Sequence, residues 1–294
     1  MTSIKIQLIM FWASVGFCFG GTVLFISGLI FKREPFVKYG TVFAYLAFIP
    51  LTAGLINRWV QTGHFPYWGV YEVLMSYAWG ALFFYVVVQF LKPGLRIAGT
   101  LVLPVVMLMV GIAVMSSVEM KEIPRTFFTY WLGIHILFAK LSYGSVIISA
   151  ALSIAYLFKS KQQKRGVVNP LLARLPQVEK IDNWNYQFIA FAFVMLGIMI
   201  ASGAVWAYKA WGRYWGWDPI ETWALISWLI YGLILHLRVT MGWRGRRASW
   251  LAVFAFILVI FSFFGIPLVY PSIHEHLKYT VGLSRGLFGN GGQA

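Results

Sequence analysis

Long uncharged stretches of apolar residues limit most strongly what this chain can fold into. The hydrocarbon core of a bilayer is about 30 Å thick, so a helix needs roughly 20 apolar residues to cross it. Six uncharged stretches reach or approach that length, and they cover residues 6–31, 39–57, 73–91, 97–118, 183–208 and 248–273. Each of them is predicted to be a membrane span.

Two further stretches are less regular. Residues 126–158 are interrupted only by Lys140, and residues 222–237 form a run of 16 that needs its flanks to cross a bilayer. Because irregular backbone is not tolerated against lipid, all eight segments should be helices. The sequence therefore predicts an all-α, polytopic integral membrane bundle of about eight transmembrane helices. We expect it to form a single domain over residues 1–294, with no separate soluble domain.

Composition excludes several other classes of protein. Hydrophobic residues make up 60% of the chain and charged residues 11%, against about 25% charged in soluble domains. A single cysteine, Cys18, excludes an internal disulfide and a cysteine-ligated zinc or iron–sulfur site. The net charge of +15 comes from bases that lie between apolar stretches, where they are expected to set topology and contact anionic lipid rather than nucleic acid.

The distribution of Lys and Arg predicts the topology. Loops that follow the odd-numbered spans hold fifteen of these residues, the opposite side holds eight, and Lys140 lies inside a span. Because basic loops face the cytoplasm, both termini are predicted outside, and the first stretch is expected to be a span, not a cleaved signal peptide. The basic loop 159–185 is then cytoplasmic, either a solvated connector or a partner-docking patch. The segments 58–68 and 207–221 and the tail from Pro271 are external.

Tryptophan is concentrated in one external segment. Six of the fourteen tryptophans lie between Trp206 and Trp228, more than a belt of aromatic residues at a membrane interface requires. If the segment is helical, Trp211 and Trp215 share one side and form a flat apolar platform suited to a planar conjugated ligand. Gly212 and Gly216 would let such a ligand approach the backbone closely.

The end of this segment has the pattern of a helix start. Asp218 is the expected N-cap, Pro219 occupies the first helical position, and Glu221 completes a capping box. This role for Asp218 is structural, whatever the segment binds.

The five histidines divide into two groups by their expected depth. His135 lies roughly 9–13 Å from the outer end of its span, near the external residues His64, His274 and His276, whereas His236 lies about 21 Å down the seventh span. A hydrogen-bonded structural role is the ordinary one for a single histidine. An ionisable group within a span is costly, however, and therefore suggests function.

Two imidazoles on opposite faces of a macrocycle are a common way to hold haem iron. His135 and His274 could form such a pair at the outer face, beneath the tryptophan-rich loop. His236 has no other histidine at its depth, so a second ligand for haem there would have to come from another polypeptide.

Several stretches resemble a known family of haem-handling membrane proteins. Residues 211–225 resemble its WWD signature, and residues 235–238 resemble the CcsA (ResC) branch of System II cytochrome c biogenesis. The resemblance covers most of the chain from about residue 55 onward. Further matching stretches are Gly63-His64-Phe65-Pro66, Tyr71-Glu72, the His135 helix with Ser142-Tyr143, and Phe263-Phe264-Gly265 leading to His274.

The resemblance implies particular roles for these residues. His135 and His274 correspond to the external histidines that flank the WWD loop and would act in catalysis as iron ligands, and His236 corresponds to a histidine within the membrane. The cofactor-binding set implied by the family is His135, His274, His236, Trp211, Trp215, Trp217 and Asp218. Haem b is the implied ligand and transported substrate. The implied partners are the CcsB (ResB) subunit and an apocytochrome c with a C-x-x-C-H segment.

The chain also departs from the family pattern. The family has His-Ser-Tyr after its last helix, whereas this chain reads Ile273-His274-Glu275-His276, so either histidine could be the ligand. Lys140 matches no position of the family, and it is expected either to pair with Glu72 or to extend outward along the span.

The resemblance therefore implies that this chain is a subunit of a cytochrome c synthase. Together with CcsB, the chain would move haem across the bacterial cytoplasmic membrane, or a thylakoid equivalent, and present it at the external WWD loop for thioether attachment to apocytochrome c. The first alternative is a haem exporter without ligation activity, for which Pro50 and Pro104 are the candidate helix breaks. The second is a regulator of haem synthesis enzymes, which the intact tryptophan motif disfavours.

Overall fold

A computed structural model describes residues 3–119, 123, 128–166 and 175–265. Within these residues every regular element is helical, and eight helices are long and apolar enough to cross a membrane. The protein is thus an integral membrane protein, as the sequence predicted. The elements are α1 (Ser3–Phe31), α2 (Glu34–Thr62), α3 (Gly69–Leu91), η1 (Pro93–Ala98), α4 (Gly99–Val114), α5 (Tyr130–Lys164), α7 (Val178–Trp211), α8 (Pro219–Met241), α9 (Arg246–Ile260) and η3 (Phe261–Gly265).

The two less regular stretches of the sequence both form full spans. The seventh begins at Pro219 and runs for 23 residues, because its flanks are helical as well. The fifth is a single helix of 35 residues that passes through Lys140 without a break. The last span continues from α9 into the short π-helical turn η3.

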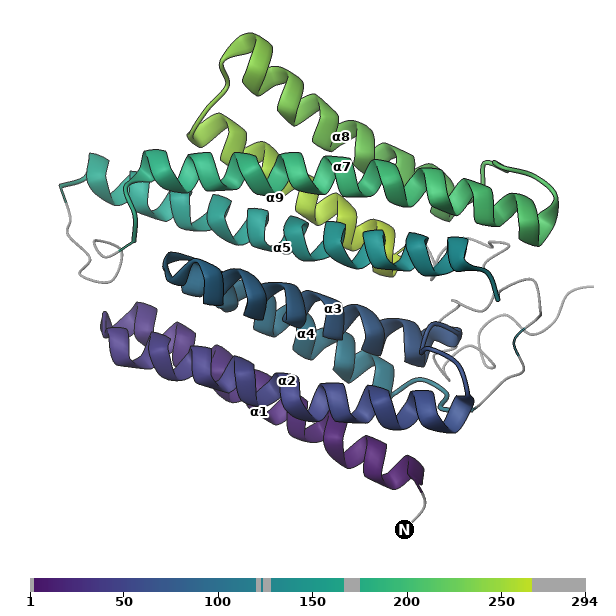
Figure 1. The fold of residues 1–294 in the computed structure, drawn as a ribbon. Coiled ribbons are helices and arrows are strands. Elements are labelled where there is room, and N and C mark those ends of the chain that lie inside the picture. Colours follow the sequence, from purple (N-terminus) through teal and green to yellow (C-terminus); the bar gives the residue numbers. More distant parts are fainter. Residues whose placement is uncertain (1–2, 120–122, 124–127, 167–174, 266–294) are drawn as a thin grey trace, which may run out of the picture.

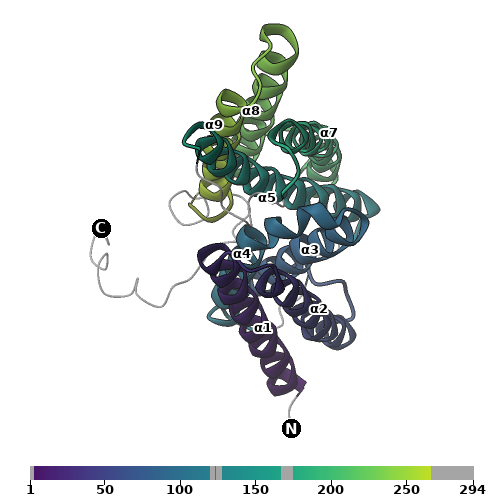
Figure 2. The ribbon, with the colours of Figure 1, turned by 90° about the vertical axis from the view of Figure 1, so that its left-hand side faces the viewer.

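The helices run roughly along one direction and pack in successive pairs (Figure 1). At one side lie α1 and α2, followed by α3 and α4 and then by α5 and α7; α9 packs beside α5, and α8 lies beyond α7. The end-on view in Figure 2 confirms that α8 lies at the periphery, where it packs on α7 and α9. Few residues of α8 are buried inside the bundle, whereas most of the apolar part of α5 is buried.

Two large hydrophobic clusters form most of the interior, and α5 contributes to both; a third, small cluster contains Leu132 and Trp206. The first joins α1–α4 to one side of α5, and the second joins the other side of α5 to α7, α8 and α9. Small residues allow this central helix to pack closely. Ser145 donates to the carbonyl of Phe188 on α7, and Ser149 and Ser153 bond to the buried amide of Asn185 (2.8 Å each).

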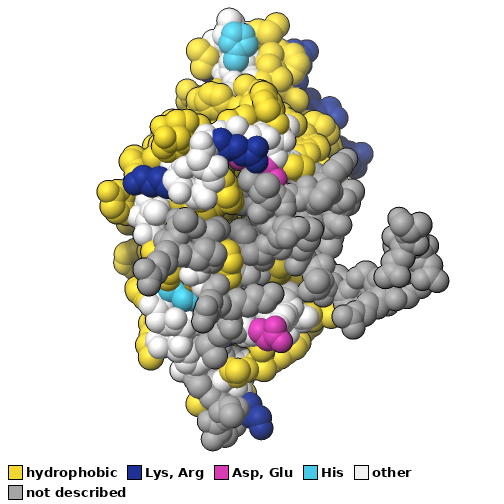
Figure 3. Space-filling view, turned by 90° about the vertical axis from the view of Figure 1, so that its right-hand side faces the viewer, with side chains coloured by type: hydrophobic (Ala, Val, Ile, Leu, Met, Phe, Trp, Pro, Cys, Tyr) yellow, Lys and Arg dark blue, Asp and Glu magenta, His cyan; other side chains and the backbone are white. Residues whose placement is uncertain are grey.

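The two ends of the bundle differ in chemistry. The loop between α7 and α8 and the start of α5 lie at the right-hand end in Figure 1, and hydrophobic side chains cover much of the described surface in the view of that end (Figure 3). At the opposite end, Arg238 forms a bidentate ion pair with Asp182 (2.7 and 3.0 Å), and the amide of Gly245 also donates to that carboxylate. This contact joins α7, α8 and the start of α9.

Candidate functional site

A cavity of about 200 Å³ lies at the end of the bundle where the tryptophan-rich loop is found. Its walls come from α3, α5, α7, α8 and η3, and they are mainly aromatic and aliphatic. Ligand sites more often measure 300–1,000 Å³, so this space would admit one edge of a planar macrocycle unless the lining rings move apart. Of the candidate ligand-binding residues from the sequence, His135, Trp211 and Trp215 line the cavity.

The ring of His135 is held in a defined orientation. Its Nδ1 lies 2.8 Å from the carbonyl oxygen of Met199 on α7. Because a carbonyl only accepts hydrogen bonds, Nδ1 must carry the proton, which leaves the lone pair on Nε2. A histidine that ligates a metal is commonly oriented by such a bond to its other ring nitrogen. A neutral His135 that makes this bond presents Nε2 as its acceptor atom, as a ligand through Nε2 would.

A glycine allows this close approach of α5 and α7. A Cβ atom at Gly203 would lie only 2.6 Å from Nδ1 of His135. Any larger residue at this position would displace the imidazole from the helix surface. The identity of Gly203 is thus tied to the orientation of His135.

Two tryptophans extend the aromatic wall outward from His135. The ring of Trp206 is stacked at 24° to the imidazole with 6.5 Å between centroids, and it meets Trp211 edge-on at 4.8 Å. Trp206 is 5% exposed, so it is a fixed part of the wall. Trp215 lines the same cavity. The rings of Trp211 and Trp215 thus line the same cavity.

The sequence analysis placed these two rings on one side of a helix, but the segment after Trp211 is not helical. The helix α7 ends at Trp211, since Gly212 adopts the left-handed conformation (φ 73°). Trp217 also has a positive φ of 56°. Its ring is 71% exposed, meets Trp215 edge-on at 5.8 Å, and is not among the residues that line the cavity.

The two glycines of this loop differ in their surroundings. A Cβ atom at Gly212 would meet open space, whereas one at Gly216 would lie 2.5 Å from the guanidinium carbon of Arg213. The backbone at Gly216 is therefore covered by an arginine of the loop itself. The expectation that a ligand contacts both glycines stays a prediction.

The capping box predicted at the start of α8 is confirmed. The side chain of Asp218 accepts a hydrogen bond from the amide of Ile220 (2.9 Å), and the carboxylate of Glu221 accepts from the amide of Asp218. Glu221 also accepts from the amide of Gly216 (2.8 Å). Since Glu221 lines the cavity as well, the capping box joins the loop to the cavity wall.

The floor of the cavity contains three aromatic residues to which the sequence analysis gave no role, although two of them, Tyr143 and Phe263, belong to stretches that resemble the family. Tyr77 of α3, Tyr143 of α5 and Phe263 of η3 meet edge-on, with centroids 5.0–5.6 Å apart. All three line the cavity. Hydroxyl-bearing rings inside otherwise apolar spans were a usable signal, but their convergence depends on how three helices pack.

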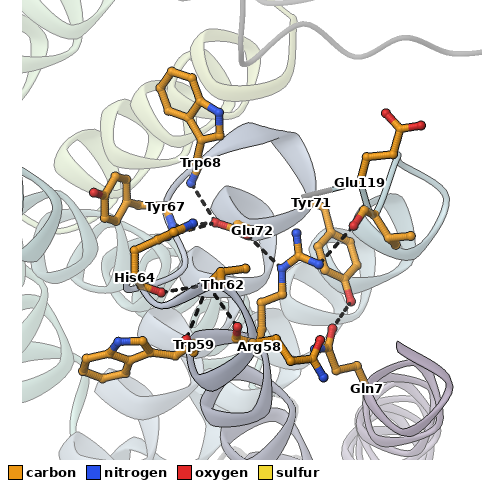
Figure 4. Close-up of polar contacts among 12 residues, drawn as sticks. Gln7, Arg58, Trp59, Thr62, His64, Tyr67, Trp68, Tyr71, Glu72 and Glu119 are labelled. Atoms are coloured by element: carbon orange, nitrogen blue, oxygen red, sulfur yellow. Dashed lines mark hydrogen bonds and ion pairs between the residues drawn. The ribbon is translucent and has the colours of Figure 1, made fainter. Parts of the chain in front are cut away.

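A second polar cluster lies beside the cavity, in the segment that joins α2 to α3 (Figure 4). Arg58 forms a buried ion pair with Glu72 at 2.8 Å. The other carboxylate oxygen of Glu72 accepts from the amides of Tyr67 and Trp68 and lies 3.9 Å from Nδ1 of His64. Glu72 thus fixes the loop that carries His64, and His64 is not a lining residue of the cavity.

The same cluster affects Tyr67, which does line the cavity. Burial raises the pKa of Tyr67, and the nearby negative charge of Glu72 raises that pKa further. The phenol therefore stays protonated at neutral pH and keeps its hydrogen-bond donor at the edge of the cavity.

The structure also decides between the two expectations for Lys140. Glu72 is taken by Arg58, and within the described residues no carboxylate lies at ion-pair distance from Lys140. The lysine stem packs against Gly80 of α3, and its ammonium lies 4.4 Å from the centroid of Phe65. Lys140 thus extends outward to the α2–α3 loop.

His236 lies far from this cavity, on the peripheral helix α8. It is exposed, and its Nδ1 is 3.3 Å from the hydroxyl of Thr240 one turn further on. His274 and His276 lie outside the described residues, so their pairing with His135 stays a prediction. No group of three or more potential metal-binding His, Cys, Asp or Glu side chains occurs in the described part of the chain.

Comparisons with known proteins point to one family. A family model described as cytochrome c assembly protein matches residues 67–274. The chain is 35% identical to the cytochrome c biogenesis protein CcsA of Guillardia theta over 271 residues, which covers 85% of this chain and 89% of that protein. It is 30% identical to CcsA of Gloeothece citriformis over 301 residues, covering 85% and 90% of the two chains.

A solved structure has a similar fold. The cytochrome c haem lyase CcmF superposes with a TM-score of 0.65 at 14% sequence identity, covering 88% of this chain. The chain spans about half of CcmF, 46% of its length. This likeness concerns the fold alone.

Proposed function

Because this chain belongs to the cytochrome c assembly protein family and has a role in cytochrome c maturation, we propose that it is the membrane subunit of a cytochrome c synthase that binds haem b at the cavity beside His135. In this proposal residues 1–294 act as one transmembrane haem-handling domain. The WWD loop faces the extracytoplasmic side of a bacterial cytoplasmic membrane or its thylakoid equivalent. The contribution of α5 to both hydrophobic clusters supports treating the chain as a single unit.

The orientation of His135 is the observation that carries the proposal. Its proton is held on Nδ1 by the Met199 carbonyl, so Nε2 is the atom that would bind iron. The stacked ring of Trp206 and the edge of Trp211 make the adjoining wall flat and apolar. Such a wall suits a conjugated macrocycle. His274 or His276 would supply the second axial ligand, and Trp217 and Asp218 would support the loop above it.

The chemistry proposed at this site is thioether formation. When bound, haem supplies the reacting vinyl groups and an iron with two axial positions. The two thiols of an apocytochrome C-x-x-C-H segment would each add S–H across one vinyl group, forming a C–S bond without net oxidation. The residues of this chain would hold and orient the substrate and exclude water. The histidine of the C-x-x-C-H segment would then displace one of this chain's histidines from the iron.

His236 would serve a different step, nearer the other end of the membrane. Its exposed position on the peripheral helix α8 suits an iron ligand that is shared with a second subunit. We propose that this subunit is CcsB and that it supplies the second imidazole. Export of haem without ligation is less well supported. The expected helix breaks are absent, because α2 continues through Pro50 and α4 continues through Pro104.

A matched pair of variants tests the proposal. In His135→Asn the amide nitrogen occupies the position of Nδ1 and can still donate to Met199, but no atom replaces Nε2. His64→Asn makes the same change in a neighbouring histidine that does not line the cavity. The full chain would be expressed with CcsB and a reporter apocytochrome, and both haem in the purified complex and covalent cytochrome would be measured.

We expect His135→Asn to abolish covalent cytochrome and to remove haem from the outer site, with normal membrane insertion. The His64→Asn variant should retain most of the covalent cytochrome and most of the bound haem. Covalent product at the wild-type level from His135→Asn would refute the site. Free haem outside the membrane without covalent product from the wild-type complex would support export instead.

A further inference from the structure

A groove lies at the end of the bundle opposite the aromatic cavity, between the last turns of α5 and the first turns of α9. It measures about 610 Å³. Its apolar walls include Leu157 of α5 and Trp250 and Val253 of α9. Trp250 is 56% exposed although it belongs to a membrane span, so this apolar surface is open to the surrounding bilayer.

Four cations line the same groove at its outer rim. Lys161, Lys164 and Arg165 come from the end of α5, and Arg246 comes from the start of α9. No acidic residue is found among the described residues that line the groove. In the described part of the chain, none of the four has a carboxylate within ion-pair distance. Among the described residues, no acidic side chain therefore offsets the repulsion between these four charges.

Helix stabilisation accounts for only part of this arrangement. Basic residues in the last turn of α5 interact favourably with the negative end of the helix dipole. Arg246 lies in the first turn of α9, where the dipole disfavours a positive charge and where no acidic residue offsets it. A cation at that position is better explained by an anion that binds in the groove.

We propose that this groove binds one anionic diacyl phospholipid, with its phosphate among the four cations and an acyl chain along Leu157, Trp250 and Val253. A soluble phosphate would leave the apolar walls unused, and a zwitterionic lipid would use the cations poorly. Basic pockets between transmembrane helices commonly bind anionic headgroups. In the topology proposed above, this end faces the cytoplasmic leaflet, which is rich in such lipids. The site is separate from the haem-binding residues, and its test does not depend on haem.

Lipid retention by the purified full-length chain tests the proposal. The protein would be delipidated in a neutral detergent and titrated with phosphatidylglycerol or with phosphatidylcholine of the same acyl chains, and bound lipid would be counted by native mass spectrometry. We expect one phosphatidylglycerol to be retained at least about tenfold more tightly than phosphatidylcholine. Equal retention of the two lipids would overturn the proposal.

Matched variants separate the groove from total charge. Arg246→Gln should weaken phosphatidylglycerol retention several-fold, whereas Arg247→Gln removes the same charge one residue later, outside the groove lining, and should not. Changing Lys161, Lys164 and Arg165 together to Gln should likewise weaken phosphatidylglycerol retention. The loss should be larger than in a control chain with Gln at positions 32, 33 and 38, which are Lys, Arg and Lys in the wild type. If a groove variant and its charge-matched control lose the same amount of phosphatidylglycerol retention, the lipid does not bind at a defined site in the groove.

The apolar part of the groove is tested separately from the charges. Val253→Trp fills the acyl-chain wall without changing charge, and it should lower phosphatidylglycerol retention while leaving the weak binding of soluble glycerol phosphate unchanged. If glycerol phosphate binds the wild-type chain as tightly as phosphatidylglycerol does, the groove is a phosphate site, and the lipid proposal is wrong.

Discussion

The two ends of this bundle place their histidines in opposite surroundings. His135 is packed between α5 and α7, bonded to a backbone carbonyl at 2.8 Å and stacked on Trp206. His236 is exposed on the most peripheral helix, and its Nδ1 lies 3.3 Å from the hydroxyl of Thr240. The first histidine is oriented by this chain alone. The second presents its ring to whatever lies beside α8.

This difference indicates a division of labour within one chain. A ligand whose orientation is fixed before binding loses little freedom when it binds, so the proposed site at His135 is suited to positioning a substrate for reaction. A histidine on an exposed helix face can be completed by a second protein, and binding there would depend on that protein. The following predictions sharpen or break this comparison, from the largest expected effect to the smallest.

The ion pairs at the two ends should differ most in their effect on stability. Glu72→Gln would leave Arg58 as an uncompensated buried charge and should lower the free energy of unfolding by about 3–5 kcal/mol. Asp182→Asn affects the pair with Arg238, whose side chains are 11% and 10% exposed, and should cost about 1–3 kcal/mol. Denaturation of both variants in one detergent measures the difference. Equal losses would show that the end of the bundle with His135 is no more tightly constrained than the end with His236.

The orientation of His135 should depend on the small residue opposite it. Gly203→Ala places a methyl group 2.6 Å from Nδ1, so the ring must move, at a cost of about 1–3 kcal/mol in stability. Haem retention at the outer site should fall as well. Gly133→Ala is the control, because a Cβ there meets nothing within 4 Å. Unchanged haem retention in Gly203→Ala would mean that the observed ring orientation is not required for binding.

The capping box at the start of α8 should contribute more to the stability of the folded chain than to haem binding. Asp218→Ala removes the acceptor for the amide of Ile220 and should cost about 1 kcal/mol, whereas Asp218→Asn keeps an acceptor and should cost less. Thermal unfolding of the two variants measures the difference. A loss of haem without a loss of stability would instead assign Asp218 a direct role at the ligand.

The inner histidine should contribute least to the stability of the chain on its own. His236→Asn changes an exposed side chain and should alter unfolding by no more than about 0.5 kcal/mol. In the complex with its partner, however, the same variant should lose haem from the inner end only. A variant that destabilises the isolated chain by several kcal/mol would show that His236 has an unrecognised structural role.

Much of the fold followed from local sequence features. The length of the apolar stretches determines how many helices cross the membrane, and a lone Lys140 does not interrupt a span because its long stem carries the charge outward. The start of α8 was also predictable, since Asp218, Pro219 and Glu221 interact only with backbone a few residues away.

Features that depend on packing or on single backbone angles were not predictable in the same way. The left-handed Gly212 ends α7 at Trp211, so the rings that follow do not continue the helical spacing. The choice of Arg58 over Lys140 as partner of Glu72, and the meeting of Tyr77 with Tyr143, both require helices distant in sequence to be placed first.

The most direct test of the central claim is electron paramagnetic resonance of ferric haem in the purified complex with CcsB, with His236→Asn present throughout to remove the inner site. The account predicts a low-spin signal from two axial imidazoles, its replacement by a high-spin signal in His135→Asn, and no change in His64→Asn. A low-spin bis-imidazole signal that persists in His135→Asn would contradict the account.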